Sequence, residues 1–505
     1  RGSPVPWQDR VYVFGYRGEG PALREVLAVV DRDTGAVRWE VSFRDFLSDI
    51  IYDRYSIGAP AVDPRTGRVF VQSSAGELMA VSPDGEVQWT VSMMDALGRL
   101  TFPNGRTGAP VVVEGQVIVH GITAAWGGTG PARDRFYAFD VDDGTVRWIA
   151  TPGTAPVDSS FSTPYIHAAD GRLTLLAGTG CGHLVAIDAR TGEVRWRAPM
   201  SVGGVNVSPV VVGDIVVAAH NKEALDQARM GAVMGWSLSA ETTPADDGTS
   251  VLAGPVWSRE LAAFSASPVT DGTLVYLVTP TGELHALAPE TGETVWTVSV
   301  GTDQLHASPA VLGDRLVVPM RDGTVHVVAA GREGGRILST VRLDGLALGA
   351  PAVAGERLIV GTTEGVTAFR VPAGPVPGPA EDAREILSAQ AAVSARVVPA
   401  EVLLRPGERV PLTLELLDGA GRVVGTAPAT SAEPFIPPTA KVRTQMDASF
   451  VDGALVAARN ASLSAGAWRV RAGAFEGITR GRVVVGVPYV EDFEDTPLDA
   501  GSDEA

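Results

Sequence analysis

The sequence is poor in the groups that most catalytic and nucleic-acid-binding sites require. Cys181 is the single cysteine among 505 residues, so no disulfide can form within the chain. Lys and Arg number 41 against 59 Asp and Glu, and this net charge of −18 argues against a nucleic-acid binder, because phosphate backbones demand clustered Lys and Arg. No apolar run approaches the roughly 18 residues of a membrane-spanning helix, so we expect no transmembrane segment.

Motifs for metal and covalent chemistry are also missing. The segment "DVDDG" (140–144) begins like a calcium loop, but "TVRW" follows it in place of the remaining ligands, which predicts a turn. Cys181 and His183 share one face of an expected strand, yet two ligands do not make a zinc site. We therefore expect Cys181 to be a small buried apolar residue.

Two short phrases are repeated along the first 372 residues. One ends in tryptophan and occurs as "DRDTGAVRW" (31–39), "SPDGEVQW" (82–89), "DVDDGTVRW" (140–148), "DARTGEVRW" (188–196) and "APETGETVW" (288–296). The other is a small residue, Pro and an apolar run, at Ser3-Pro4, Ala59-Pro60, Ala109-Pro110, Thr163-Pro164, Ser208-Pro209, Ser267-Pro268, Ser308-Pro309 and Ala350-Pro351. Repetition at such intervals indicates repeated structural units rather than one catalytic motif.

Each unit is predicted to hold four antiparallel strands, because period-2 alternation is bounded by Gly, Asp and Pro. In the Asp-Thr-Gly turn the glycine can take a positive φ, and the Asp or Thr side chain can bond the turn backbone. The indole that follows would lie between neighbouring sheets. These structural docking positions are Trp39, Trp89, Trp148, Trp196, Trp257 and Trp296. Four-stranded units repeated radially form a β-propeller.

The segment "AIDARTGEVRW" (186–196) fits the tryptophan docking phrase of the pyrroloquinoline-quinone-type propellers at every fixed position. Residues 1–372 thus resemble this quinoprotein-like superfamily, and its outer-membrane-assembly propellers in particular. The resemblance implies an all-β propeller of eight blades, with seven as the fallback. The last copy, "GVTAFRVPAG", has no aromatic residue, so we expect its blade to need a strand from the other terminus, before Arg1.

Beyond the repeats the composition changes. Residues 373–387 form a Pro/Gly linker, and residues 388–488, with "PGE" and "DGAG" turns between strands, resemble a bacterial immunoglobulin-like β-sandwich. Trp468 is expected in its core. Residues 489–505 read as an acidic tail, or as the start of a further lectin-like domain.

The resemblance also invites a test for quinone-dependent dehydrogenase activity. Those enzymes use a vicinal Cys-Cys roof over the cofactor and a calcium ion beside a catalytic Asp. A single cysteine excludes the roof, so we predict no catalytic, cofactor-binding or metal-binding residues and no cofactor. Contacts with a partner are expected at the propeller mouth or on long loops, although these side chains could also be structural filling. The candidates are Tyr55, Arg106, Trp126, Phe161, Asn206, Phe264 and His306.

These patterns favour a non-enzymatic, secreted, periplasmic or cell-surface propeller that acts as a protein-interaction scaffold. The expected partner is a protein or cell-surface component, not nucleic acid. Two alternatives stay open: a quinone- or carbohydrate-binding propeller with dehydrogenase activity, and an adhesin with a lectin-like extension. The oligomeric state is left open by the sequence.

Overall fold

The computed structural model describes residues 2–18, 22–43, 58–97, 108–123, 133–225, 229–302, 306–372, 391–436 and 443–484. Within these ranges the protein is all-β apart from one short helix, α1 (Met93–Leu97). No helix in them has the length and apolar content needed to cross a bilayer.

Up to residue 372, the described ranges form eight antiparallel sheets, which we number one to eight in chain order. Sheet one consists of β1 (Val5–Trp7), β2 (Arg10–Arg17), β3 (Arg24–Asp31) and β4 (Val37–Phe43), and sheet two of β5 (Ala61–Val62), β6 (Val69–Gln72), β7 (Glu77–Val81) and β8 (Val87–Ser92). Sheet three consists of β9 (Val111–Val113), β10 (Gln116–Thr123), β11 (Arg133–Asp140) and β12 (Val146–Ala150), and sheet four contains β13 (Tyr165–Ala169), β14 (Arg172–Gly178), β15 (His183–Asp188) and β16 (Val194–Pro199). Sheet five consists of β17 (Val210–Val212), β18 (Ile215–Glu223), β19 (Met230–Ser237) and β22 (Trp257–Arg259), and sheet six of β23 (Val269–Thr270), β24 (Val275–Val278), β25 (Glu283–Leu287) and β26 (Thr294–Ser299). Sheet seven consists of β27 (Ala310–Leu312), β28 (Arg315–Pro319), β29 (Thr324–Ala329) and β30 (Ile337–Arg342), and sheet eight of β31 (Ala352–Ala354), β32 (Arg357–Gly361) and β33 (Val366–Arg370).

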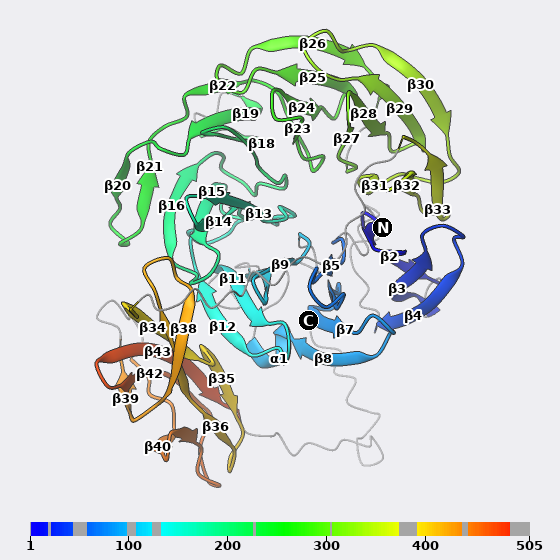
Figure 1. The fold of residues 1–505 in the computed structure, drawn as a ribbon. Helices are drawn as coiled ribbons and strands as arrows, with labels where there is room; N and C mark the ends of the chain where they lie inside the picture. The colour runs from blue at the N-terminus through cyan, green and yellow to red at the C-terminus, as the bar shows by residue number, and fades with distance from the viewer. Residues whose placement is uncertain are drawn as a thin grey trace, which may run out of the picture.

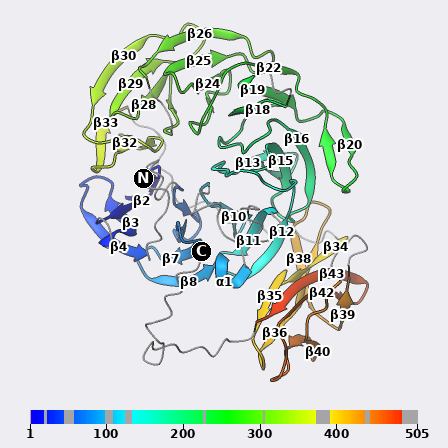
Figure 2. The ribbon, with the colours of Figure 1, turned by 180° about the vertical axis from the view of Figure 1, so that it is seen from behind.

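The sheets follow one another around a ring, with the first strand of each sheet toward the middle and the last at the periphery (Figures 1 and 2). Sheet one and sheet eight lie side by side, so the ring closes on itself. The eighth sheet has three strands among the described residues, where most of the others have four.

The turn before each peripheral strand explains why the tryptophan phrase is repeated. In the first copy, Asp31 Oδ1 accepts hydrogen bonds from the backbone N–H groups of Asp33 and Thr34, at 3.1 and 2.9 Å. Gly35 then adopts a φ of 71°, a conformation that side chains with a Cβ disfavour. The phrase therefore encodes the reversal from the third strand into the fourth.

The fifth sheet differs from the repeated four-strand unit by an insert between its third and fourth strands. A short helix or ordered loop is a natural expectation for "HNKEALDQARMGAVM" (220–234), but its described parts extend β18 and β19 as a long hairpin. The polar insert that follows forms β20 (Thr242–Pro244) and β21 (Ser250–Leu252), which reach back to the fourth sheet. There β21 pairs in parallel with β16, and Arg197 bridges Asp247 at 2.6 Å.

The core is divided among the interfaces between sheets. Between sheets one and two, for example, Tyr12, Phe14 and Leu27 pack against Val69 and Val71. Sheets six and seven share a similar cluster. The interface of sheets one and eight is much smaller and consists of Val11, Val13 and Ile359 with Val30 packed beside them. Apolar packing is therefore weakest where the ring closes.

A second unit follows the ring and has its own core. Its strands are β34 Ser394–Val398, β35 Glu401–Leu404, β36 Arg409–Pro411, β37 Thr413–Leu417, β38 Val423–Pro428, β39 Ser431–Phe435, β40 Ser449–Val451, β41 Ala454–Val456, β42 Ser464–Ala472 and β43 Phe475–Val483. They form three sheets, in the orders β34-β37-β38, β35-β43-β42-β39 and β36-β41-β40. Trp468 is buried among their apolar side chains, as expected.

The second unit is docked on the third sheet of the ring, beside β12 and α1 (Figure 1). The backbone N–H of Ala400 donates to the carbonyl of Val146 at 2.8 Å. The carboxylate of Glu415 accepts hydrogen bonds from Arg147 of the ring and from Arg396 of its own unit. Burial by itself would raise the pKa of Glu415, but the charges of the two guanidinium groups outweigh burial and lower that pKa.

Candidate functional site

The Ser/Thr-Pro phrases form an inner belt that links neighbouring sheets. At each link, the backbone N–H of the residue before proline donates to the hydroxyl of the equivalent residue in the next sheet. These links run from Ala109 to Thr163 at 3.0 Å, Ser208 to Ser267 at 2.9 Å, Ser267 to Ser308 at 2.8 Å and Ala350 to Ser3 at 2.8 Å. The repeat reveals these positions, but the hydrogen bond between sheets is not evident from the sequence.

Two of the residues expected at the mouth lie together next to the fourth and fifth sheets. Phe161 and Asn206 are both buried, and the backbone N–H of Phe161 donates to Asn206 Oδ1 at 3.3 Å. The neighbouring Ser160 hydroxyl donates to the carbonyl of Val205 at 2.6 Å. These groups form hydrogen bonds with one another inside the ring, as side chains that fill the mouth for structural reasons would.

A second pair of mouth residues lies in contact between the sixth and seventh sheets. The rings of Phe264 and His306 meet edge to face, with centroids 5.7 Å apart. His306 Nδ1 lies 2.8 Å from the hydroxyl of Ser265. Three further candidates, Tyr55, Arg106 and Trp126, lie outside the described residues.

The cysteine and its histidine neighbour are packed inside the fourth sheet. Cys181 Sγ lies 3.0 Å from His183 Nδ1 and 3.1 Å from Thr179 Oγ1. Burial raises the pKa of the Cys181 thiol and, with the charge of Arg197, lowers the pKa of His183 to about 4. At neutral pH both groups are uncharged, so they form no thiolate–imidazolium nucleophile. Across the described ranges, no three His, Cys, Asp or Glu side chains are grouped to hold a metal ion.

The indoles of the tryptophan phrase cover the glycine turns of the following sheet. Trp39 Nε1 donates to the carbonyl of Pro83 at 2.9 Å, and a Cβ on Gly85 would approach the ring within 2.9 Å. The same pairing joins Trp89 to Gly144, Trp148 to Gly192, Trp257 to Gly292 and Trp296 to Gly335. Indole N–H groups again donate to turn carbonyls, from Trp89 to Val141 at 3.1 Å, Trp257 to Pro289 at 2.7 Å and Trp296 to Gly331 at 2.8 Å.

Trp196 is placed differently from the other five. It is buried in the large apolar cluster that extends through sheets four, five and six, where Trp236 and Trp257 also lie. Its strand, β16, receives the β20–β21 hairpin on its outer edge. In the fifth sheet, the insert that carries β20 and β21 thus stands between β19 and β22 where the other sheets have a short glycine turn.

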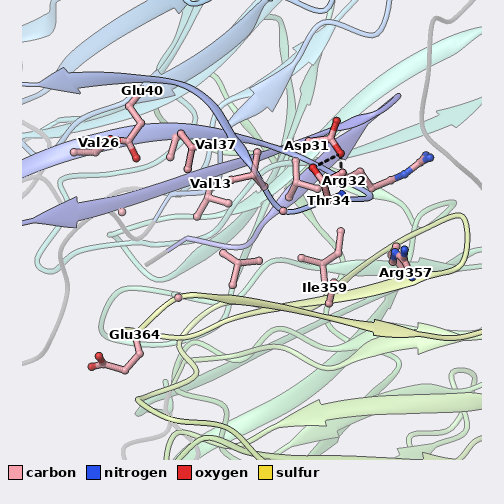
Figure 3. A pocket seen from close by; sticks show the side chains of 18 of the residues that line it. Val13, Val26, Asp31, Arg32, Thr34, Val37, Glu40, Arg357, Ile359 and Glu364 are labelled. Carbon is pink, nitrogen blue, oxygen red and sulfur yellow. Dashed lines mark hydrogen bonds between the residues drawn. The ribbon is translucent and has the colours of Figure 1, made fainter.

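A cleft of about 640 Å³ opens between the first and eighth sheets, where the apolar interface is smallest (Figure 3). Val13, Val26 and Val37 of sheet one face Ile359 of sheet eight across it. The Asp31–Gly35 turn lines one end, and Glu364 lies near the opposite end. These residues are not among the sequence-based candidates. The missing aromatic residue in the last copy of the phrase was the signal that could have found them.

The fold and these contacts define a β-propeller with tryptophan-covered turns. The family described as outer membrane protein assembly factor BamB matches residues 23–298, 244–330 and 280–484. The chain belongs to this family. It is 26% identical over 375 residues to outer membrane protein assembly factor BamB of Burkholderia pseudomallei, covering 73% of this chain and 84% of the relative. The Yersinia pestis protein of the same name is 24% identical, covering 67% and 78%.

Solved structures show the same fold at lower identity. BamB from Moraxella catarrhalis superposes with a TM-score of 0.53 at 19% identity, covering 73% of this chain and 95% of that one. Quinohemoprotein alcohol dehydrogenase from Comamonas testosteroni gives 0.51 at 14% identity, covering 78% and 77%. Because both assembly factors and dehydrogenases share this fold, fold similarity alone does not decide between them.

Proposed function

We propose that this chain is a non-enzymatic protein-interaction scaffold of the cell envelope, in the manner its assembly-factor relatives suggest. The observation that carries the proposal is the family match, which begins at residue 23 and covers the ring from β3 onward. We take the eight sheets as the eight blades of the propeller. We take the second unit as an immunoglobulin-like spacer that is docked on the third blade. The same relatives support an envelope location, and we propose that the chain is secreted, periplasmic or at the cell surface.

A quinone-dependent activity is disfavoured by the residues of this chain. One cysteine cannot form a vicinal disulfide above the cofactor. The described ranges bring together no carboxylate cluster for the calcium ion that accompanies the quinone. The cysteine content and the described residues therefore do not fit a pyrroloquinoline quinone cofactor with its calcium ion.

The proposal is tested by capture on the immobilised chain 1–505 from a detergent-solubilised cell-envelope extract. We expect enrichment of an outer-membrane assembly component, identified by mass spectrometry, relative to the heat-unfolded chain. Equal recovery on folded and unfolded chains would overturn the scaffold proposal. A second arm adds pyrroloquinoline quinone with Ca²⁺, and we expect no rise in melting temperature. A rise accompanied by oxidation of an alcohol would establish the dehydrogenase instead.

A further inference from the structure

We propose that a pocket between the ring and the second unit binds a small organic carboxylate, with arginine side chains at its charged group and apolar side chains around the rest of the molecule. The pocket has a volume of about 300 Å³ and lies where β12 of the ring meets β34 and β43 of the second unit. We call it the interunit pocket. The proposal does not depend on the scaffold function, because no partner protein takes part in it.

Backbone hydrogen bonds join the two walls of the interunit pocket. The N–H of Ala400 donates to the carbonyl of Val146 at 2.8 Å, and the N–H of Arg480 donates to the carbonyl of Ala400 at 3.2 Å. Ala400 therefore connects β12 to β43 and brings Arg147, the neighbour of Val146, and Arg480 to the same pocket. Because each unit supplies one wall, the site exists only while the two units are docked.

The charged residues that line the interunit pocket are all basic. They are Arg147, Arg396 and Arg480. Glu415 is paired with Arg147 and Arg396, but it is not among the residues that line the pocket. Burial and the neighbouring charge of Arg147 lower the pKa of Arg396, even though Glu415 lies beside it. An anion in the pocket would therefore lie closer to guanidinium groups than to this carboxylate, and its charge would be stabilised.

Several donors of the lining residues have no acceptor within the described part of the chain. They are Arg147 Nε, Trp148 Nε1 and Arg480 Nη2, of which the last lies 3.2 Å from Glu401 Oε2 without making a hydrogen bond. Trp148 differs in this from the four phrase indoles that donate to turn carbonyls. Buried donors without acceptors are costly, and a carboxylate offers two oxygens that can accept a bidentate pair from a guanidinium group. A rotation of either guanidinium toward the pocket would bring its donors to a bound carboxylate.

The remaining walls favour an organic molecule over an inorganic ion. Trp148, Ile149 and Val397 contribute apolar surface to the lining, and Ile478, which is 49% exposed, lies where the pocket meets solvent. A volume of about 300 Å³ is at the small end of ligand sites and suits a ring-sized group rather than a peptide. An aromatic or branched aliphatic carboxylate combines the charge and the apolar body that this lining requires.

The test measures binding of benzoate to the full chain 1–505 by isothermal titration calorimetry in a low-salt buffer free of carboxylates and phosphate. Benzamide, which has nearly the same shape but no charge, is the matched control ligand. We expect benzoate to bind with a Kd of about 0.1 to 1 mM, as the number of its atoms allows. Benzamide and inorganic phosphate should bind at least about tenfold more weakly, because the first lacks the charge and the second lacks the apolar body.

Two substitutions in the chain locate the site. Ile478→Asp places a carboxylate at the pocket and should weaken benzoate binding about tenfold or more. Val451→Asp introduces the same charge at a position on β40 that is 45% exposed and does not line the pocket, so binding should be unchanged. Arg480→Lys keeps a positive charge beside Glu401 but loses the planar fork, and we expect binding to weaken about fivefold or more. Circular dichroism checks that each variant is folded.

Hydrogen–deuterium exchange tests whether the ligand lies between the two units. Benzoate should slow exchange of the Ala400 amide, which crosses the interface to Val146. Three results would overturn the proposal: no saturable binding of benzoate up to about 10 mM, equal binding of benzamide or phosphate, or equal binding by the Ile478→Asp and parent chains. Binding with unchanged exchange at Ala400 would also overturn it, because the ligand would then lie elsewhere.

Discussion

The backbone N–H of Ala350 donates a 2.8 Å hydrogen bond to the hydroxyl of Ser3, which joins the last sheet of the ring to the first. This bond extends the inner belt that also links Ser267 to Ser308. At the periphery the same two sheets are separated by the cleft. Among the described residues, the ring is therefore closed at its inner strands and open at its outer ones.

Replacing Ser3 should weaken this closure. In Ser3→Ala the N–H of Ala350 loses its acceptor, so we expect the free energy of unfolding to fall by about 1 kcal/mol. Urea denaturation followed by circular dichroism measures the change. Ser339→Ala, at an exposed position on β30, is the control and should stay within about 0.5 kcal/mol of the parent. Equal values for the two variants would contradict a role for the belt.

Removing a covering indole should be far more costly. Trp257 is 8% exposed and lies over Gly292, so Trp257→Ala should lower the free energy of unfolding by about 3 to 5 kcal/mol. The exposed Val87, truncated to alanine, should change it little. Chemical denaturation of both variants provides the comparison, and an unchanged midpoint for Trp257→Ala would refute the covering role.

Two glycine substitutions distinguish a covered turn from an uncovered one. Gly35 and Gly292 have φ values of 71° and 66°, so alanine at either costs about 1 to 2 kcal/mol of backbone strain. At Gly292 the new methyl group also meets the indole of Trp257, which should add about 1 to 3 kcal/mol. Thermal denaturation should therefore rank Gly292→Ala well below Gly35→Ala. Equal losses would show that the Gly35 turn is covered after all.

Acid should loosen the second unit from the ring. The pKa of Glu415 is lowered in the folded protein, so its ion pairs stabilise the docked state above the ordinary value of 4.5, and this contribution is lost as the pH falls through the lowered value. Glu415→Gln removes the carboxylate that Arg396 pairs with and leaves Arg147 paired with Asp140, so it should cost about 3 kcal/mol at pH 7. Melting curves from pH 7 downward should show the two proteins converging at acid pH. A constant difference would contradict this assignment.

The repeated phrases predict much of the ring because local physics fixes them. The Asp side chain and the positive-φ glycine of a turn such as 31–35 are chosen by backbone geometry alone, so the sequence shows where each third strand reverses. The indole that follows each turn is equally visible. Its partner, the turn of the next sheet, follows from the order of repeats.

Contacts between distant segments could not be predicted in this way. The β20–β21 hairpin returns to β16, and its Asp247 pairs with Arg197, although nothing near either residue encodes that meeting. The same holds for Arg147 and Glu415, which are brought together only when the second unit docks. The cleft lies where the described part of sheet eight has no fourth strand, and a single sequence records this only as a missing aromatic residue in the last copy of the phrase.

Hydrogen–deuterium exchange of the full chain tests most directly the central claim that the inner belt closes the ring. We predict slow exchange of the backbone amide of Ala350, which donates to Ser3, comparable with that of Ser267, which donates to Ser308. Fast exchange at Ala350 beside slow exchange at Ser267 would contradict a ring that is closed between its first and last sheets.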